Sequence, residues 1–279
     1  MSEIPFWKVE SVGNDFVLVD LAALDALGIG EDRLPAITRA VSPRRFGIGS
    51  DGLLALDTRP RPLRMRMFNP DGSEDFCGNG LRCAARFATT RAGVEPSFSI
   101  HHLGREVPVQ VSPDGMIQTG IGTASFDPAL VPLIGGELFE GPLESAGETL
   151  IVSALSTGST HTILFVDSLP DDETFERLGP AIENHPRFPE RTSAIWAVPD
   201  GRDTLRIRIW ERGAGETQGC GTGSSAAAAA WLRREGRGGT VTVHNPGGTL
   251  RVAMDAWDAP IRVEGRARVL FEGTFVVDR

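Results

Sequence analysis

One short pattern occurs twice in this chain and constrains its fold more than any other feature. Residues 76–87 read FCGNGLRCAARF, and residues 219–230 read GCGTGSSAAAAA. In each copy a cysteine precedes Gly-x-Gly and a segment of small residues with helical spacing. The two copies lie close to half the chain length apart. Because the cysteine, both glycines and the helix recur in register, an internal repeat explains the pattern better than two chance glycine-rich turns.

The segments around the two copies predict strands. Apolar residues alternate with polar ones in runs such as LRMRMF and TLRIRIWE, and Gly, Pro and Asp clusters separate these runs. Helical spacing is rarer and is clearest over residues 33–40, 79–92, 172–184 and 222–235. A stretch rich in Pro, Gly and Glu follows Ala124. We therefore expect two similar domains, an N-terminal one over residues 1–123 and a C-terminal one over residues 124–266.

Charge and hydropathy exclude several classes of partner. The 279 residues carry a formal net charge of -9 with no block of basic residues, which argues against nucleic-acid binding. No segment has the ~18 uninterrupted apolar residues of a membrane span, and the first residues show no secretory signal. Three cysteines are too few for a disulfide-stapled secreted domain. We expect a cytoplasmic protein with no membrane or nucleic-acid partner.

Cofactor and metal chemistry also find little support. Lys8 is the single lysine of the chain, and it lies in a strand-like run with no phosphate-binding glycine loop beside it. Pyridoxal phosphate requires a lysine for its Schiff base, so this cofactor is disfavoured. Neither Cys77 with Cys83 nor His101 with His102 has the spacing of a zinc site. We expect no cofactor and no metal.

A cysteine at the start of a helix has a particular chemistry. Unpaired N–H groups and the positive end of the helix dipole make this position an anion site, and they favour the thiolate by lowering the thiol pKa. Two such thiols suit the inversion of a stereocentre beside a carboxylate, which needs one base and one acid on opposite faces. Cys83, inside the first helix, is expected to be only a small buried apolar residue.

Two other readings of the cysteine turns stay open. A Cys-His-Asp nucleophile for acyl transfer would use one turn but gives no reason for the other. A non-catalytic module that binds an anion or an amino acid would explain the glycines and leave the paired cysteines unexplained. Thiol alkylation separates these readings, because a binding module tolerates it better than a two-thiol catalyst.

Several motifs resemble, in order and spacing, those of the diaminopimelate epimerase family. Members of this family are pyridoxal-independent isomerases that act on amino acids. These motifs are GNDFVLVD, RRFGIGSDGLL, FNPDGSEDFCGNGLRCAARF, WERGAGETQGCGTGSSAAAA, NPGGTLRV and EGRARVLFEG. The resemblance implies an α+β fold of two pseudo-symmetric domains, each a mixed curved sheet around a central helix, with the active site in the cleft between them. The final strand, residues 267–279, would return to the first domain. The implied activity is the conversion of LL- to meso-diaminopimelate in lysine and peptidoglycan precursor synthesis.

The resemblance also implies the site residues. Cys77 and Cys220 are the two bases, with His161 associated with the first cysteine. Glu211 is the corresponding neighbour of the second. The implied substrate-binding positions are Asn14, Asn69, Gly78, Asn79, Ser159, Ser193, Arg212, Gly221 and Thr222.

Two of these positions depart from the family pattern. The family usually reads GNPH where this chain has GSTH, and ERTN where it has ERTS, so Ser159 and Ser193 each replace an asparagine. In the family, both asparagines contact the distal end of diaminopimelate. A racemase of a different amino acid on the same scaffold is therefore the alternative activity. The family also suggests a homodimer.

Overall fold

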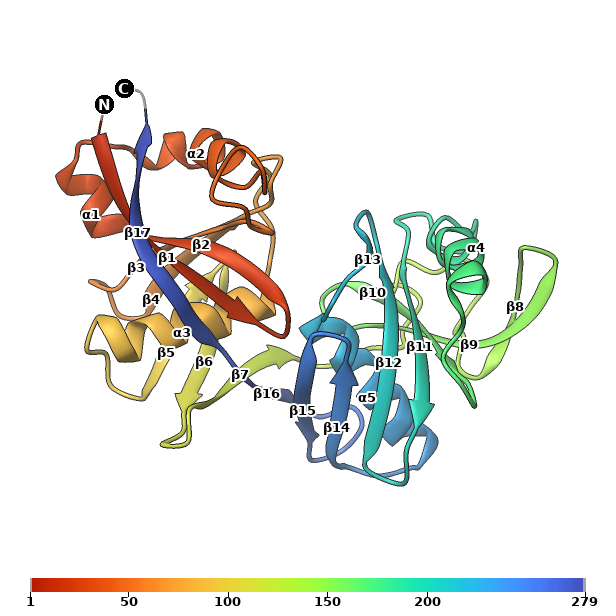
Figure 1. The fold of residues 1–279 in the computed structure, drawn as a ribbon. Helices are drawn as coiled ribbons and strands as arrows, with labels where there is room; N and C mark the ends of the chain where they lie inside the picture. Colours follow the sequence, from red (N-terminus) through yellow and green to blue (C-terminus); the bar gives the residue numbers. More distant parts are fainter. Residues whose placement is uncertain (1, 278–279) are drawn as a thin grey trace. The chain divides into compact units, whose positions relative to one another are not determined.

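The computed structural model describes residues 2–277, which form two compact units (Figure 1). The first unit contains the described residues up to Thr119 and those from Glu264 onward, and the second runs from Gly120 to Val263. Both units combine β-strands with a few α-helices, so the predicted α+β class is confirmed. Within residues 2–277, no helix is long and apolar enough to span a membrane.

The first unit is a mixed sheet whose pairing order follows the chain. Its strands are β1 (Ser2–Ser11), β2 (Asn14–Asp20), β3 (Leu53–Asp57), β4 (Leu63–Phe68), β5 (Ser97–His102), β6 (Arg105–Val111), β7 (Met116–Gly122) and β17 (Arg268–Val277). β1 pairs antiparallel with β2, β2 parallel with β3, β3 antiparallel with β4, β4 parallel with β5, and β5 antiparallel with β6. β17 returns from the end of the chain to pair antiparallel with β1.

The second unit repeats this order. Its strands are β8 (Gly141–Ser145), β9 (Glu148–Ser156), β10 (Thr160–Phe165), β11 (Ser193–Pro199), β12 (Thr204–Glu211), β13 (Gly215–Glu216), β14 (Gly239–Asn245), β15 (Gly248–Met254) and β16 (Ile261–Arg266). From β9 through β10, β11, β12 and β14 to β15, the pairs alternate antiparallel and parallel as they do from β1 to β6. The predicted internal repeat is therefore confirmed at the level of topology.

Each unit encloses one long helix at the equivalent place in its strand order. α3 (Gly78–Arg91) connects the parallel strands β4 and β5, and α5 (Gly221–Arg234) connects β12 and β14. Each helix lies against most strands of its own unit (Figure 1). Residues 226–230 of α5 are all alanines with no exposed surface, and these small side chains let the strands pack close to the helix. Cys83 of α3 is fully buried in the core, as predicted.

Shorter helices cover the other face of each sheet. In the first unit these are α1 (Leu21–Ala26), the 3-10 turn η1 (Glu31–Arg33) and α2 (Leu34–Val41); in the second it is α4 (Asp172–Glu183). Successive residues of β2 alternate between two cores: Phe16 and Leu18 pack with α3, whereas Val17 and Val19 pack with α1 and α2. Burial on both faces explains why these central strands have apolar runs rather than alternation.

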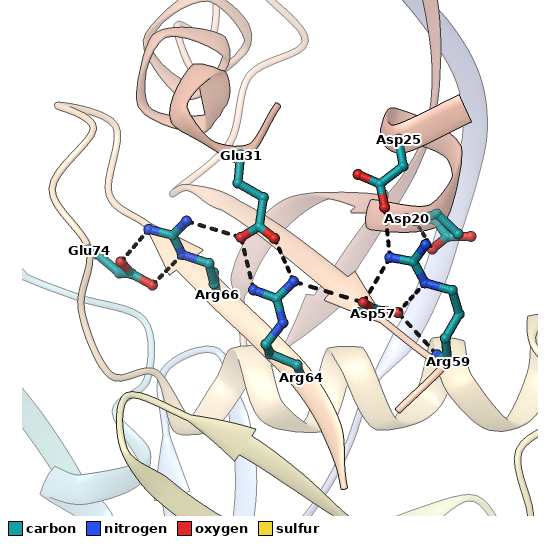
Figure 2. Close-up of polar contacts among 9 residues, drawn as sticks. Asp20, Asp25, Glu31, Asp57, Arg59, Arg64, Arg66 and Glu74 are labelled. Carbon is teal, nitrogen blue, oxygen red and sulfur yellow. Dashed lines mark hydrogen bonds and ion pairs between the residues drawn. The ribbon is translucent and has the colours of Figure 1, made fainter. Parts of the chain in front are cut away.

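The arginines of β4 are held in ion pairs on the surface of the first unit (Figure 2). Arg64 and Arg66 both bind Glu31, and Arg66 also binds Glu74 at 2.7 Å. Arg59 binds Asp57 and Asp25 in the same way. Carboxylates therefore neutralise all three of these arginines.

Candidate active site

The first cysteine turn sets Cys77 at the start of α3. Cys77 is the N-cap residue, with extended backbone angles of φ -135° and ψ 108°, and its Sγ accepts a hydrogen bond from the backbone N–H of Gly80 at 3.2 Å. A thiol here takes the place of the Ser, Thr or Asp side chain that usually caps a helix. Cys77 is only partly buried.

The second cysteine turn repeats this geometry. Cys220 is the N-cap of α5, with φ -129° and ψ 119°, and its Sγ accepts from the N–H of Gly223 at 3.3 Å. A Cβ at Gly80 would lie 2.8 Å from Cδ2 of Leu54, and one at Gly223 would lie 2.8 Å from Cδ1 of Ile209. The second glycine of each Gly-x-Gly thus leaves room for a strand side chain that packs against the first turn of the helix.

The surroundings of Cys220 keep it protonated. Its Sγ donates to Oε1 of Glu211 at 3.4 Å and lies 3.3 Å from Oγ1 of Thr222, while Oγ1 of Thr217 donates to the other Glu211 oxygen at 2.8 Å. Burial raises the pKa of Cys220 well above its ordinary value, and the negative charge of Glu211 raises it further. The hydrogen bonds from Gly223 and Thr222 act in the opposite direction but are outweighed. The expectation of a lowered thiol pKa is wrong for Cys220, because the sequence pattern does not reveal burial.

His161 lies in the same unit as Cys220, on β10. Its Nε2 is 3.0 Å from Oγ of Ser159, whose hydroxyl also donates to Oγ1 of Thr222 at 3.4 Å. Its Nδ1 has no hydrogen-bond partner among residues 2–277. Burial lowers the pKa of His161 to about 3, and the positive charge of Arg212 contributes. The imidazole is therefore neutral at physiological pH, and its implied association with Cys77 stays a prediction.

Arg212 and Ser193 are joined through the backbone. Oγ of Ser193 accepts the N–H of Arg212 at 3.0 Å, and Ser193 pairs with His161 in the parallel register of β10 and β11. The guanidinium of Arg212 is exposed and donates to the carbonyl of Glu190 at 3.0 Å. The residues of the second unit that were predicted to form the site are thus connected in one group: Ser159, His161, Ser193, Glu211, Arg212, Cys220, Gly221 and Thr222.

Glu183, at the end of α4, supports this group and was not predicted from the sequence. One carboxylate oxygen accepts from Nε1 of Trp210 at 2.7 Å, and the other accepts from the N–H of Gly213 at 2.9 Å. These two donors flank Glu211 and Arg212 in the chain, so a single buried carboxylate fixes the turn that presents both. No local signal could identify it, because Glu183 is distant from this turn in sequence.

The first unit contains the other predicted residues, of which Asn14 and Asn79 are hydrogen-bonded to each other. The Asn79 amide donates to Oδ1 of Asn14 at 3.4 Å, and the Asn14 amide donates to Asp51 at 2.6 Å. The fully buried Arg82 donates to Oδ1 of Asn79. Asn69 lies in the turn after β4, where its amide donates to Ser73 at 3.1 Å. Gly78 opens α3, and apart from its own chain neighbours and helix backbone, no described atom lies within 4 Å of where its Cβ would be.

The described residues show little that resembles a metal or pyridoxal site. Residues 2–277 contain no group of three or more His, Cys, Asp or Glu side chains placed to hold a metal ion. The ammonium of Lys8 is buried, and it is bound to Asp15 at 2.5 Å and to the carbonyl of Gly49. The single lysine is thus engaged in a structural ion pair.

A family model and the sequences of known proteins relate this chain to the same family. The chain matches the family described as diaminopimelate epimerase over residues 6–126 and 153–269. It is 37% identical to a diaminopimelate epimerase of Cupriavidus taiwanensis over 98% of this chain and 97% of that protein.

Two solved structures share the fold at low sequence identity. One is a phenazine biosynthesis protein of the PhzF family from Bacillus anthracis, with a TM-score of 0.70, 21% identity, and coverage of 99% of this chain and 100% of that one. The other is a hydroxyproline epimerase from Agrobacterium vitis, with a TM-score of 0.67, 15% identity, and coverage of 99% and 91%.

Proposed function

Because the chain belongs to the diaminopimelate epimerase family and is thus an isomerase, we propose that it inverts the α-carbon of diaminopimelate, with Cys77 and Cys220 exchanging protons with that carbon. The observation that carries this proposal is the repeated cap geometry. Each of two equivalent helices begins with a cysteine whose sulfur accepts the N–H three residues on. Inversion needs one proton-transferring group on each face of the carbon, and each unit supplies one.

The protonation state of Cys220 assigns the first step. Burial raises the pKa of Cys220 and keeps it as a thiol, so in the proposed first step Cys220 is the acid and Cys77 is the base. The α-proton passes to the sulfur of Cys77, and the carbanion takes the proton of the Cys220 thiol on its other face. In the reverse direction Cys220 must lose its proton first, and the Glu211 carboxylate at 3.4 Å can accept it.

The helix starts provide the sites for the substrate carboxylate. The first N–H groups of a helix lack intrahelical partners and lie at the positive end of its dipole. Gly78 and Asn79 open α3, and Gly221 and Thr222 open α5. A carboxylate bound at such a helix start would lie next to the sulfur that caps the same helix, and the N–H groups would stabilise the charge that develops on deprotonation.

The two serines favour a second candidate, a racemase acting on a different amino acid. Ser159 binds His161 and Thr222, and the oxygen of Ser193 accepts the N–H of Arg212, so both hydroxyls already have a partner within the protein. A serine is also shorter than an asparagine and offers one hydroxyl in place of an amide. Arg212 remains exposed and suited to a distal carboxylate. Because of Arg212, we keep diaminopimelate as the proposed substrate and expect weaker discrimination at its distal centre.

One assay tests the proposal and its alternative together. Dialysed, chelator-treated protein is incubated with LL-diaminopimelate and, separately, with ornithine, lysine, glutamate and histidine, and the stereoisomers are separated by chiral chromatography. The proposal requires meso-diaminopimelate to form without any added cofactor or metal. A higher kcat/KM for any of these four amino acids than for diaminopimelate would favour the alternative. Ser159→Asn combined with Ser193→Asn should then raise turnover of diaminopimelate.

We also infer a homodimer in a reducing, cytoplasmic compartment. No disulfide joins Cys77, Cys83 or Cys220, all of which lie among the described residues, and thiols persist in reducing compartments. β17 exposes Leu270 and Phe271 on the surface of the first unit, an apolar strand that a second copy could cover. Light scattering on the purified protein tests the dimer, and Phe271→Glu should shift it toward the monomer.

A further inference from the structure

His102, the last residue of β5, bonds through both ring nitrogens although it has no exposed surface. Its Nδ1 lies 3.1 Å from the carbonyl oxygen of Met65. A carbonyl can only accept a hydrogen bond, so Nδ1 carries the proton and Nε2 has a free lone pair. That lone pair accepts the backbone N–H of Cys77 at 3.3 Å.

The surroundings keep this ring neutral and fixed. Burial lowers the pKa of His102, which favours the neutral form that can accept at Nε2. The ring of Phe76 stacks on the imidazole, with centroids 5.1 Å apart and an angle of 21° between the planes. Because Phe76 directly precedes Cys77, the imidazole contacts both residues of the peptide that leads into α3.

We propose that His102 is a positioning residue for Cys77: it fixes the peptide before the cysteine and thereby the place of the sulfur at the start of α3. The backbone of Cys77 is extended, and this conformation brings Sγ to 3.2 Å from the Gly80 N–H. α3 fixes the peptide after Cys77, and His102 fixes the peptide before it. This inference rests on the proposed catalytic role of Cys77.

The second unit has a different residue at the equivalent place. β5 pairs with β4 up to His101 opposite Arg64, and β14 pairs with β12 up to His244 opposite Arg206. His102 and Asn245 each follow by one residue and end their strands. Asn245 accepts from the Ser224 hydroxyl at 3.1 Å. An amide at this position therefore fits the fold, and the imidazole is a feature of the Cys77 side alone.

Replacing His102 by asparagine or by glutamine distinguishes a role in positioning Cys77 from a role in packing alone. In His102→Asn the amide reaches about as far as Nδ1, so the link to Met65 is kept and the link to Cys77 is lost. In His102→Gln the amide reaches about as far as Nε2, so an oxygen can still accept from Cys77. The readout is the ratio of the alkylation rates of Cys77 and Cys220 by iodoacetamide without substrate, measured by mass spectrometry. Cys220 serves as an internal control, and His101→Gln, at the exposed neighbour, is the matched variant.

The expected result is a split between the two amides. His102→Asn should lower the ratio and kcat roughly three- to tenfold, the size expected for the loss of one hydrogen bond, because the Cys77 sulfur loses its fixed place at the Gly80 N–H. His102→Gln and His101→Gln should stay within about twofold of wild type. Equal ratios in the Asn and Gln variants, or a ratio that rises in His102→Asn, would overturn the inference.

A measurement on the unaltered protein provides a second test. Long-range ¹H–¹⁵N spectra should show His102 neutral at pH 7 with its proton on Nδ1, and an Nε2 proton or a charged ring would overturn the inference. Neither alkylation nor these spectra depend on the substrate. Suppose that the protein fails to epimerise diaminopimelate, but that the alkylation ratio falls in His102→Asn and not in His102→Gln. The proposed function would then be refuted, and the role of His102 in positioning Cys77 would still hold.

Discussion

Cys77 and Cys220 cap two topologically equivalent helices in the same way: each sulfur accepts the N–H of the glycine three residues on, at 3.2 Å and 3.3 Å. The environments of the two sulfurs nevertheless differ. Cys220 is buried beside Glu211, whereas Cys77 is partly exposed and its own N–H is bound by His102. The repeat thus provides two similar groups that differ in burial and in polar neighbours.

Replacing either cap cysteine should abolish most activity. Cys77→Ala and Cys220→Ala each remove one partner of a two-sided proton transfer, so kcat should fall between about 100-fold and 10,000-fold. Cys83→Ala is the matched control, since Cys83 is fully buried in the core and should change kcat little. Chiral chromatography of the product measures all three. Near-normal turnover in either cap variant would refute the assignment.

Glu211 and Thr222 should shift the reactivity of Cys220 in opposite directions. The Glu211 charge raises the pKa of Cys220, so Glu211→Gln should make the thiol easier to ionise and speed its alkylation at a given pH. The hydrogen bond of Thr222 lowers that pKa, so Thr222→Val should slow the reaction. The rates are measured against pH in a Cys77→Ala background. Changes of the same sign in both variants would contradict this account.

Alanine substitutions at the two glycines of the first motif should have different effects, one on stability and the other on activity. A Cβ at Gly80 would crowd Leu54, so Gly80→Ala should destabilise the fold by about 1–3 kcal/mol. The space around Gly78 is open, so Gly78→Ala should fold normally but crowd the bound carboxylate and lower kcat/KM roughly tenfold or more. Urea unfolding and steady-state kinetics on the two variants separate the effects. Full activity in Gly78→Ala would exclude the carboxylate from this turn.

Acid should destabilise the protein through His161. Its pKa falls to about 3 in the folded protein from an ordinary 6.5, so the unfolded chain binds a proton in this window that the folded protein does not bind. The stability that comes from keeping His161 buried and neutral is fully present above about pH 6.5, and it is lost as the pH falls toward about 3. Between pH 7 and pH 5, the free energy of unfolding should drop roughly 1–2 kcal/mol more in wild type than in His161→Gln. Parallel urea-unfolding curves would show that His161 is not buried in its neutral form.

The repeat, the two central helices and most strands could be predicted because they are local patterns. The helix predicted over residues 79–92 is α3, Gly78–Arg91, and that over 222–235 is α5, Gly221–Arg234. Small residues after a Cys-Gly-x-Gly turn indicate such helices whatever surrounds them. α1 was not predicted, because its six residues are too few to show a helical period.

The environment of the site was harder to predict because it depends on distant parts of the chain. The helix start alone favours a lowered thiol pKa, but the burial of Cys220 and the Glu211 carboxylate reverse the shift. Glu183 and His102 reach the site from the ends of α4 and β5. Their spacing from Gly213 and Cys77 follows no local period, so only the folded chain reveals these contacts.

The central claim is that two different groups deliver and remove the proton. The most direct test converts LL-diaminopimelate in D2O and stops the reaction early, while most of the starting isomer remains. Mass spectrometry of the separated isomers then locates deuterium. The two-thiol account predicts one deuterium on the inverted carbon of the meso product and none in the remaining LL isomer. Product that retains the original hydrogen, or deuterium shared equally between the two isomers, would show that a single group serves both faces and would contradict the account.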